Sequence, residues 1–599
     1  MCGVFAFFLK RSLNDQDLEL ARCAVKEIAH RGPDGSGEWF DRAKGVYLGH
    51  TRLSIIDISH ASDQPIVRDR HAFVFNGEIY NYQDLKRDLV KGGTQFSSQG
   101  DGEVLFRALE TWGEGALDRV DGMFALIDWD GESARLAVDS FGEKPLFTAE
   151  TAEGVYVCSE IAPLVKALNL QPSIGESDWC AYLSLGFLPQ PTTFYKEIEM
   201  LPPGTLRYVR SGNLGSIKKY YDLPSPIVAT GAPEPITDAA IDDLAEALTE
   251  SLERRLIADV PLTLFLSAGV DSSLIAALCR FELGHKPECL TVSFNNVKGM
   301  RDEAPVASQI AEFLGFEHRV VDHQNEGVSI EQIVELLAQP NGTVGALPLK
   351  QISSIARNAG YKVALSGIGG DEVTSGYAKH AYVWNIRNIY KIPQMVRSVL
   401  GQGLRVSKKT SGIATLLRTT QEELYVTVKN YPALDGLRQI PGFQHWVENE
   451  FSKCSAPEIA IPRYELDTVM PAVHLLISDH ASMRHGLELR TPFLNRKVVD
   501  VVSKWDPRSL VAFGQKQVLR SLLNRYLPEK LTSQPKTGFS YPKSKLLERP
   551  SPTFLPGLPD QLVEGYWNKR FAGGGWHNLA VRVSAADIFF NAKKVTPSD

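Results

Sequence analysis

The feature that most constrains the fold is a strand, a loop of small residues and a helix that follow one another near the middle of the chain. Residues 260–266, Val-Pro-Leu-Thr-Leu-Phe-Leu, are typical of a buried strand. They run directly into Ser-Ala-Gly-Val-Asp-Ser-Ser and a helical pattern that ends at Phe281. In such a loop, backbone N–H groups and the helix N-terminus can hold an anion such as a phosphate. An ordinary strand-to-helix turn is the alternative, because small residues are common in turns.

Strands and helices continue to alternate after this loop. Residues 290–294 predict the next strand, and residues 363–365 predict a further one that ends in the Gly-rich turn 366–372. Such alternation favours a mainly parallel α/β sheet, whose ligands bind at the carboxyl ends of the strands. The second half of the chain is therefore predicted to be an α/β domain that binds a phosphate-bearing ligand.

The first half has a different pattern. Short apolar runs typical of strands, such as residues 3–8 and 72–75, alternate with turn signals and predict a β-rich domain. Polar clusters interrupt these runs at residues 30–35, 49–54, 75–81 and 100–104. Each cluster alone is compatible with a turn, since Gly, Asn, Asp and Pro favour turns.

Cys2 follows only Met1, so removal of the initiator methionine leaves a cysteine as the first residue. An N-terminal cysteine combines a thiol nucleophile with its own α-amine, whose pKa of about 8 lets it accept and return a proton. The alternative is that Cys2 is a small buried apolar residue at the start of a strand.

Length and composition exclude several classes of protein. A chain of 599 residues predicts two or three domains, which we place at residues 2–210 and 236–599 with a Pro-rich linker at 211–235. The net charge of −7 provides no basic stripe for nucleic acid, and no apolar run approaches the length of a membrane span. The seven cysteines are scattered without a CxxC pair, which argues against disulfides or zinc and favours the cytoplasm.

Cys2 and the four polar clusters together resemble the glutaminase domain of the class II amidotransferases. That family has the N-terminal-nucleophile (Ntn) hydrolase fold, an αββα sandwich. Its motifs Cys-Gly, His-Arg-Gly-Pro-Asp, Arg-Leu, Asn-Gly-Glu and Asp-x-Glu occur here in this order. The resemblance implies that Cys2 attacks the side-chain amide of L-glutamine and releases ammonia. It also implies an oxyanion hole of Asn76 and Gly77, and a glutamine-binding pocket of Arg52, Glu78 and Asp101.

The string that begins at Ser267 resembles the pyrophosphate loop of the N-type ATP pyrophosphatases. Ala268 stands where that loop usually has Gly, a change that is tolerable if φ at this position is negative. Motifs at residues 485–494, 516–520 and 535–539 resemble those of glutamine-dependent asparagine synthetases. From residue 2 to about 545, the chain is similar to asparagine synthetase-type amidotransferases.

This similarity implies that the second half uses ATP to adenylate a carboxylic acid, with Mg²⁺ on the triphosphate. The residues that it assigns to ATP are Leu266, Ser267, Gly269, Asp271, Ser272, Ser273, Val292, Ser293, Ser366, Gly367 and Lys516. Lys536 is assigned a catalytic role in adenylation, and Asp271 and Asp371 are the implied Mg²⁺ ligands.

The acceptor side departs from the family. Ile368 stands where asparagine synthetases carry Glu or Asp, a candidate proton acceptor, and the expected acceptor pocket consists of Ile368, Asp371 and Glu372. Ala338-Gln339-Pro340 stands where the family often has Asp-Glu-Pro, and Asn495 stands where Asp is common. We therefore expect a carboxylic-acid acceptor other than free aspartate. The alternatives are an authentic asparagine synthetase, a β-lactam or macrolactam synthetase, and an inactive scaffold; the sequence also leaves a homodimer open.

Overall fold

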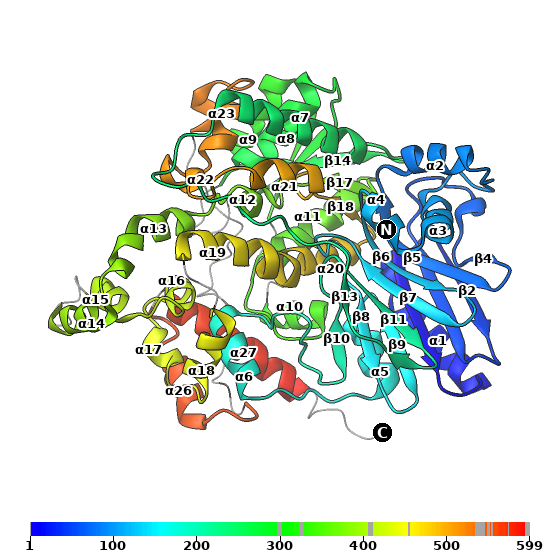
Figure 1. Ribbon diagram of the computed structural model, residues 1–599, viewed down its shortest axis with the longest axis horizontal. Helices are drawn as coiled ribbons and strands as arrows, with labels where there is room; N and C mark the ends of the chain where they lie inside the picture. Colours follow the sequence, from blue (N-terminus) through cyan, green and yellow to red (C-terminus); the bar gives the residue numbers. More distant parts are fainter. Residues whose placement is uncertain are drawn as a thin grey trace.

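The computed structural model describes residues 2–295, 302–323, 329–404, 411–452, 456–533, 546–547, 552, 555–572 and 574–592. Within these residues the first half contains two antiparallel β-sheets and the second half a parallel sheet followed by a large helical region (Figure 1).

The two antiparallel sheets form the sandwich. The first has the order β10-β8-β9-β1-β3-β2, and the second has the order β12-β11-β7-β6-β5-β4, with β13 also paired to β11. The strands of the first are β1 (Cys2–Leu9), β2 (Gly35–Asp41), β3 (Val46–Arg52), β8 (Phe147–Glu150), β9 (Gly154–Cys158) and β10 (Ile198–Met200). Those of the second are β4 (Ile66–Arg68), β5 (His71–Ile79), β6 (Gly122–Trp129), β7 (Ser133–Val138), β11 (Thr205–Arg210), β12 (Asn213–Leu214) and β13 (Lys218–Lys219). Helices α1 (Asp15–Glu27) and α5 (Ile161–Leu168) cover the first sheet, and α2 (Tyr82–Lys91), α3 (Asp101–Trp112) and α4 (Ala116–Arg119) accompany the second.

Strand β1 lies at the centre of the sandwich, and all eight of its residues are buried. Because alternate side chains of a strand point to opposite faces, β1 serves two cores. Val4 and Phe8 pack between the two sheets, whereas Phe5 and Phe7 pack toward the helical layer of α1. A strand buried on both faces places its first residue, Cys2, inside the domain. The predicted αββα sandwich is confirmed.

The parallel sheet of the second half has the order β16-β15-β14-β17-β18. Its strands are β14 (Leu262–Phe265), β15 (Glu288–Ser293), β16 (His318–Asp322), β17 (Val363–Leu365) and β18 (Glu488–Arg490). The helices that connect or flank them are α7 (Asp238–Arg255), α8 (Val270–Phe281), α9 (Ala304–Leu314), α10 (Ile330–Leu337), α11 (Ala346–Asn358) and α12 (Gly370–Val373). The parallel α/β sheet is confirmed, and β18 is an edge strand that the sequence pattern did not predict.

The helical region follows β17 and surrounds β18. Its α-helices are α13 (Ala378–Ile386), α14 (Gln394–Gly403), α15 (Ser411–Arg418), α16 (Leu424–Asn430), α17 (Leu434–Leu437), α18 (Phe443–Glu450), α19 (Pro457–Tyr464), α20 (Leu476–Met483), α21 (Arg496–Ser503), α22 (Ser509–Ala512), α23 (Gln517–Leu523), α24 (Glu529–Thr532), α26 (Asp560–Asn568) and α27 (Gly575–Ala592). A π-helix, Glu465–Leu475, joins α19 to α20. Among the described helices, none combines the length and the apolar character that a membrane crossing needs.

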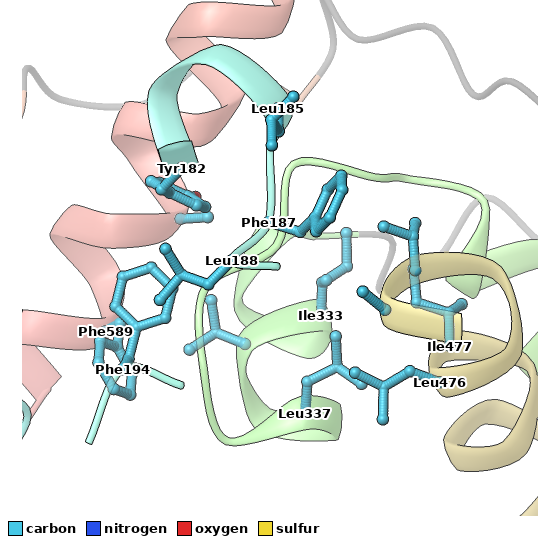
Figure 2. Close-up of a cluster of buried hydrophobic side chains, with 14 of the residues drawn as sticks. Tyr182, Leu185, Phe187, Leu188, Phe194, Ile333, Leu337, Leu476, Ile477 and Phe589 are labelled. Atoms are coloured by element: carbon cyan, nitrogen blue, oxygen red, sulfur yellow. The ribbon is translucent and has the colours of Figure 1, made fainter. Parts of the chain in front are cut away.

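Helix α6 (Glu176–Leu185) belongs to the first half by sequence but packs against α16, α18 and α27 of the second. Figure 2 shows Tyr182 and Phe194 of this segment beside Phe589 of α27, with Leu337 and Leu476 in the same cluster. The Phe194 ring lies 5.1 Å from Tyr182 and 5.7 Å from Phe589. The C-terminal helix, in a region where we found no motif, thus covers part of the first half.

The predicted linker begins as part of the sandwich. Strands β12 and β13 lie within residues 211–235 and pair with β11, so only the chain after Lys219 runs without helix or strand until α7. The domain limits at residues 210 and 236 stay a prediction.

Candidate active site

Cys2 is held at one end of β1 by main-chain contacts on several sides. It is opposite Arg52 in the β1–β3 register, and its carbonyl accepts a hydrogen bond of 3.1 Å from Arg31 Nε. Its backbone nitrogen donates to Asn76 Oδ1 at 2.9 Å. Burial raises the pKa of the Cys2 thiol, and the nearby N-terminal charge and Arg52 oppose that rise. The thiol lines a pocket between the two sheets of the sandwich and α3.

Asn76 and Gly77 follow one another on β5 beside Cys2. Asn76 is fully buried, and its Nδ2 has no hydrogen-bond partner among the described residues. A Cβ at Gly77 would lie 2.0 Å from the carbonyl oxygen of Met123 on β6, so only glycine fits there. The pair places an unused amide donor and a close-packed backbone at the pocket that contains the thiol.

Arg52 lines the same pocket but is already bound. Its Nη1 donates to Asp63 Oδ1 at 2.6 Å and to the carbonyl of Ser59 at 2.7 Å, and its Nη2 donates to the carbonyl of Asp57 at 2.5 Å. These bonds fix the guanidinium against the loop that follows β3.

Glu78 and Asp101 add two buried carboxylates to the pocket. Asp101 begins α3, and its Oδ2 accepts a hydrogen bond of 2.8 Å from the backbone of Ile79. Burial, with the charge of Glu488, raises the pKa of Asp101 to about 6 although that backbone bond opposes the rise. Burial and the charges of Glu488 and Asp101 also raise the pKa of Glu78. Of the sequence-predicted glutaminase residues, all but Asn76 line this one pocket, and Asn76 is hydrogen-bonded to the backbone of Cys2. The two carboxylates would stabilise a positively charged group in it.

The loop between β14 and α8 lies at the carboxyl end of its strand, as predicted. Ser267 Oγ accepts from the backbone of Gly269 at 3.0 Å and lies 3.0 Å from Ser272 Oγ. Ser272 Oγ accepts from the backbone of Ser267 at 3.1 Å, and Ser273 is buried in the first turn of α8. Ala268 is not among the described residues with positive φ, so its methyl group causes no strain.

The Gly-rich turn after β17 packs directly against this loop. A Cβ at Gly367 would lie 2.9 Å from the backbone nitrogen of Ser272, and one at Gly370 would lie 2.8 Å from Asp271 Cγ. The absence of side chains lets the two loops touch. Ser366 and Gly367 therefore lie beside the first loop, as the sequence predicted.

The other residues assigned to ATP lie at neighbouring strand ends. The backbone nitrogen of Leu266 donates to Leu290 at 3.0 Å, which ties the end of β14 to β15. Val292 and Ser293 end β15, and Ser293 Oγ donates to Asp302 Oδ2 at 2.9 Å. The sheet order brings these residues to one edge, next to both loops.

Lys516 stands between the two loop carboxylates. Its Nζ lies 2.5 Å from Asp271 Oδ2 and 2.8 Å from Asp371 Oδ1, and the side chain is only 4% exposed. Its φ of +55° is uncommon for a residue other than glycine, and such conformations concentrate at functional sites. The long-range pairing of Lys516 with both aspartates was not predictable from the motif that contains it.

The two aspartates also fit the chemistry of Mg²⁺. Asp271 Oδ1 is buried and has no hydrogen-bond partner among the described residues, so it offers a free acceptor. Mg²⁺ in nucleotide sites commonly uses one or two carboxylates together with phosphate oxygens. No group of three or more His, Cys, Asp or Glu side chains that could hold a metal occurs in the described part of the chain.

The expected acceptor residues lie on and after the Gly-rich turn. Ile368 is half-buried and packs against the apolar cores on both sides of the turn. Glu372 is buried, and Tyr377 Oη donates to its Oε1 at 2.5 Å, with His474 Nε2 3.6 Å from the same oxygen. Burial raises the pKa of Glu372. Lys536, the remaining catalytic prediction, lies outside the described residues.

Asn495, which stands where the family commonly has Asp, makes structural contacts. Its Oδ1 accepts from the backbone of Lys497 at 2.8 Å and caps α21, and its Nδ2 donates to Asp121 Oδ1 at 3.0 Å. Both groups of the amide are used in capping a helix and in joining the two halves. Asn495 therefore has a structural role, and its place on the acceptor side stays a prediction.

Sequence reasoning missed a set of buried charges that join the two halves. Arg31 Nη2 donates to Asp479 Oδ2 at 2.7 Å, and the Arg31 side chain is fully buried. Arg490 Nε donates to Glu488 Oε1 at 2.6 Å, and Arg490 Nη2 lies 3.9 Å from Glu78 Oε2. The available signal was the presence of Arg31 in the polar cluster at residues 30–35, and of Glu488 and Arg490 between the apolar residues of 485–494.

Comparisons with known proteins agree with this arrangement. Residues 1–221 match a family described as a glutamine amidotransferase domain, and residues 243–568 match the family described as asparagine synthase. A Mycobacterium bovis protein provisionally named glutamine-hydrolysing asparagine synthetase is 31% identical, covering 90% of this chain and 88% of that protein. Asparagine synthetase 1 of Bacillus subtilis, also named glutamine-hydrolysing, is 28% identical, with 90% and 87% covered. Amidase chry2 of Gibberella zeae is 26% identical, with 93% and 90% covered.

A sandwich of two antiparallel sheets with a buried cysteine at the start of its first strand belongs here to a glutamine amidotransferase domain. It is joined to the parallel sheet of an asparagine synthase domain, and the two domains define a glutamine-hydrolysing amidotransferase. The chain belongs to the asparagine synthase family. It is an enzyme of the asparagine synthetase-like carbon–nitrogen ligase type, and its two domains support glutamine-dependent, ATP-using amide formation. Glutamine, ATP and an acceptor are its implied substrates.

Proposed function

We propose that the protein hydrolyses L-glutamine at Cys2 and transfers the ammonia to a carboxylic acid that it activates with ATP, giving an amide, AMP and pyrophosphate. The main observation in support of glutamine hydrolysis is the environment of the Asn76 amide. Its Oδ1 is fixed by the backbone of Cys2, while its buried Nδ2 donor has no partner among the described residues. A donor fixed in this way stabilises the negative charge that develops on a substrate carbonyl oxygen.

In the first site the α-amine of Cys2, free once Met1 is removed, takes the thiol proton as sulfur attacks the amide carbon of glutamine. The oxyanion of the tetrahedral intermediate binds Asn76 Nδ2 and the Gly77 N–H. The intermediate collapses when the amine returns the proton to the leaving nitrogen, which departs as ammonia and leaves a thioester on Cys2. Water then hydrolyses the thioester to glutamate and the free thiol. Arg52 holds the α-carboxylate, and the carboxylates of Glu78 and Asp101 hold the α-ammonium.

In the second site a carboxylate oxygen of the acceptor attacks the α-phosphorus of ATP, and pyrophosphate leaves. Ammonia then attacks the acyl-adenylate, forms the C–N bond and expels AMP. The loop that begins at Ser267 and the ammonium of Lys516 contact the phosphates, and Lys536 is proposed to stabilise the same transition state. Asp271 and Asp371 would hold Mg²⁺, which offsets phosphate charge.

We propose further that the acceptor is not free aspartate. Ile368 can accept no proton. Of the two acids that follow it, Asp371 is paired with Lys516 and Glu372 already accepts a hydrogen bond from Tyr377. An authentic asparagine synthetase is the second candidate, favoured by the names of the Mycobacterium and Bacillus relatives. The complete set of glutaminase residues around Cys2 argues against a lactam-forming synthetase, which needs no ammonia.

The glutaminase half is tested by comparing the full chain with Cys2→Ala. We expect the variant to lose glutamine hydrolysis and to keep amide synthesis from ammonium chloride. Cys2→Ala protein that still hydrolyses glutamine would contradict the assignment of the nucleophile. Failure of ammonia to replace glutamine in that variant would contradict the two-site scheme.

The acceptor is tested by AMP release with glutamine, ATP and one carboxylic acid at a time. We expect little AMP and no asparagine with aspartate, and stimulated release with at least one other acid. Robust asparagine formation would establish the second candidate and overturn the proposed acceptor class.

A further inference from the structure

Strand β18 brings one residue into contact with both candidate sites. The carbonyl of Arg490 accepts a hydrogen bond of 2.9 Å from the backbone of Ser366, the first residue of the Gly-rich turn at the nucleotide site. The side chain of the same arginine reaches the first half, where its Nη2 lies 3.9 Å from Glu78 Oε2. Glu78 lines the pocket that contains Cys2.

The guanidinium of Arg490 is rigidly held. Its Nε donates to Glu488 Oε1 at 2.6 Å, and its Nη1 donates to the carbonyls of Arg255 and Ile257 at 2.7 Å each. Arg490 and Glu488 are both fully buried. Arg490 Nη2 has no hydrogen-bond partner among the described residues, and neither does Glu78 Oε2. A fixed positive charge therefore faces the carboxylate without closing a direct hydrogen bond on it.

This charge matters because its surroundings are buried and rich in carboxylates. Glu78 is 4% exposed, and its neighbours Asp101 and Glu488 are also buried. The centre of the buried Tyr80 ring lies 5.6 Å from the guanidinium of Arg490. Charges attract strongly where water is excluded, so Arg490 acts on the position and ionisation of Glu78 across the gap.

We propose that Arg490 is a positioning residue that sets Glu78 for the α-ammonium of glutamine and couples the glutamine pocket to the nucleotide turn at Ser366. The inference rests on the proposed glutaminase function. Movement of the turn on ATP binding pulls on the backbone of Arg490 and shifts its guanidinium relative to Glu78. Because coupling between two binding equilibria is reciprocal, glutamine also changes the affinity for ATP.

The positioning role is tested by glutaminase kinetics on the full chain with Arg490→Lys, which keeps the charge but loses the planar fork. We expect the KM for L-glutamine to rise about tenfold while kcat changes far less. The matched control is Lys362→Met, which removes an ion pair of 2.7 Å to Asp34 across the same interface and next to the same strand. The control should leave the KM unchanged, and an unchanged KM in Arg490→Lys would overturn the proposal.

A double variant separates positioning from a general loss of structure. If Arg490 acts through Glu78, then Arg490→Lys adds little to the KM of a Glu78→Gln protein, because the interaction has already been removed. Additive effects of the two substitutions would show that Arg490 acts elsewhere and would overturn the proposal.

The coupling is tested by measuring the glutamine KM with and without MgATP. We expect the wild-type KM to change about fivefold or more, and the change to disappear in Arg490→Lys. The coupling would be overturned if the wild-type KM for glutamine were the same with and without MgATP. It would also be overturned if MgATP changed the KM of Arg490→Lys as much as it changes that of the wild type. A wild-type chain without glutaminase activity would instead refute the proposed function.

Discussion

The two candidate sites contain buried carboxylates that are neutralised in different ways. At the nucleotide site Lys516 contacts Asp271 and Asp371 directly, at 2.5 and 2.8 Å. At the glutamine pocket the guanidinium of Arg490 stands 3.9 Å from Glu78. Direct pairing stabilises carboxylates that must stay ionised beside a polyanion, whereas the looser pairing leaves Glu78 available to a substrate ammonium. The environment of each carboxylate therefore predicts the charge of the ligand.

Removing the ammonium of Lys516 should have the largest effect of the substitutions considered, and the effect should be on stability. Lys516→Met leaves Asp271 and Asp371 buried without the ammonium that pairs them, which should cost about 3–5 kcal/mol of unfolding free energy. Urea unfolding measures the loss. Lys497→Met, which removes an exposed pair with Glu250, is the control and should cost at most about 1 kcal/mol. Equal losses in the two variants would contradict the structural importance of the Lys516 pairs.

Asn76→Ala should separate the two sites by activity. Loss of one oxyanion donor typically lowers kcat by about 100- to 1000-fold, and we expect this for glutamine hydrolysis. ATP binding, measured by calorimetry, should not change, because Asn76 lies in the other half. A glutaminase kcat within a factor of a few of wild type would rule out Asn76 as an oxyanion donor.

The pH dependence of glutamine hydrolysis should show whether the carboxylates of the glutamine pocket bind the substrate ammonium. Burial raises the pKa of Asp101 to about 6 and that of Glu78 in the same direction. As the pH falls through about 6, Asp101 takes up a proton and loses its attraction for the α-ammonium, so kcat/KM should fall up to about tenfold per pH unit. The Asp101→Asn variant should have a lower kcat/KM for glutamine, and this kcat/KM should change less with pH on the acid side. A wild-type profile that stays level down to pH 5 would show that neither carboxylate binds the ammonium.

Asn495→Ala should have the smallest effect. The variant loses the cap of α21 and the bond to Asp121, so we expect about 1 kcal/mol less stability in urea. The acceptor preference measured by AMP release should be unchanged. A change of acceptor preference in this variant would show that Asn495 acts on the acceptor side.

The sequence predicted those parts of the sites that lie within short contiguous motifs. Cys2, Asn76 and the loop from Ser267 are recognisable because neighbouring residues specify both the local backbone and the chemistry. The β-rich first half and the parallel sheet of the second half followed from the pattern of apolar runs, whereas the sandwich arrangement was implied by the family resemblance.

The connections between the halves were beyond such reasoning. Glu78 and Arg490 are separated by most of the chain, and nothing local to either residue indicates its partner. The three-residue strand β18 is too short to show periodicity, and the left-handed backbone of Lys516 reflects tertiary contacts that no local pattern reveals. The capping role of Asn495 was also not predicted, because Asn occurs both in helix caps and in polar pockets.

The packing of α6 on α27 affects whether the first half of the chain can be expressed as a separate soluble fragment. Seven consecutive residues of α6, from Trp179 to Leu185, are buried, and the helix packs against α16, α18 and α27 of the second half. Figure 2 shows two of them, Tyr182 and Leu185, in the apolar cluster that contains Phe589 of α27. A fragment cut near residue 210 would expose this apolar face to water. Large exposed apolar patches promote aggregation. We therefore expect the sandwich fragment to be insoluble unless α27, from the C-terminal end of the chain, is supplied with it.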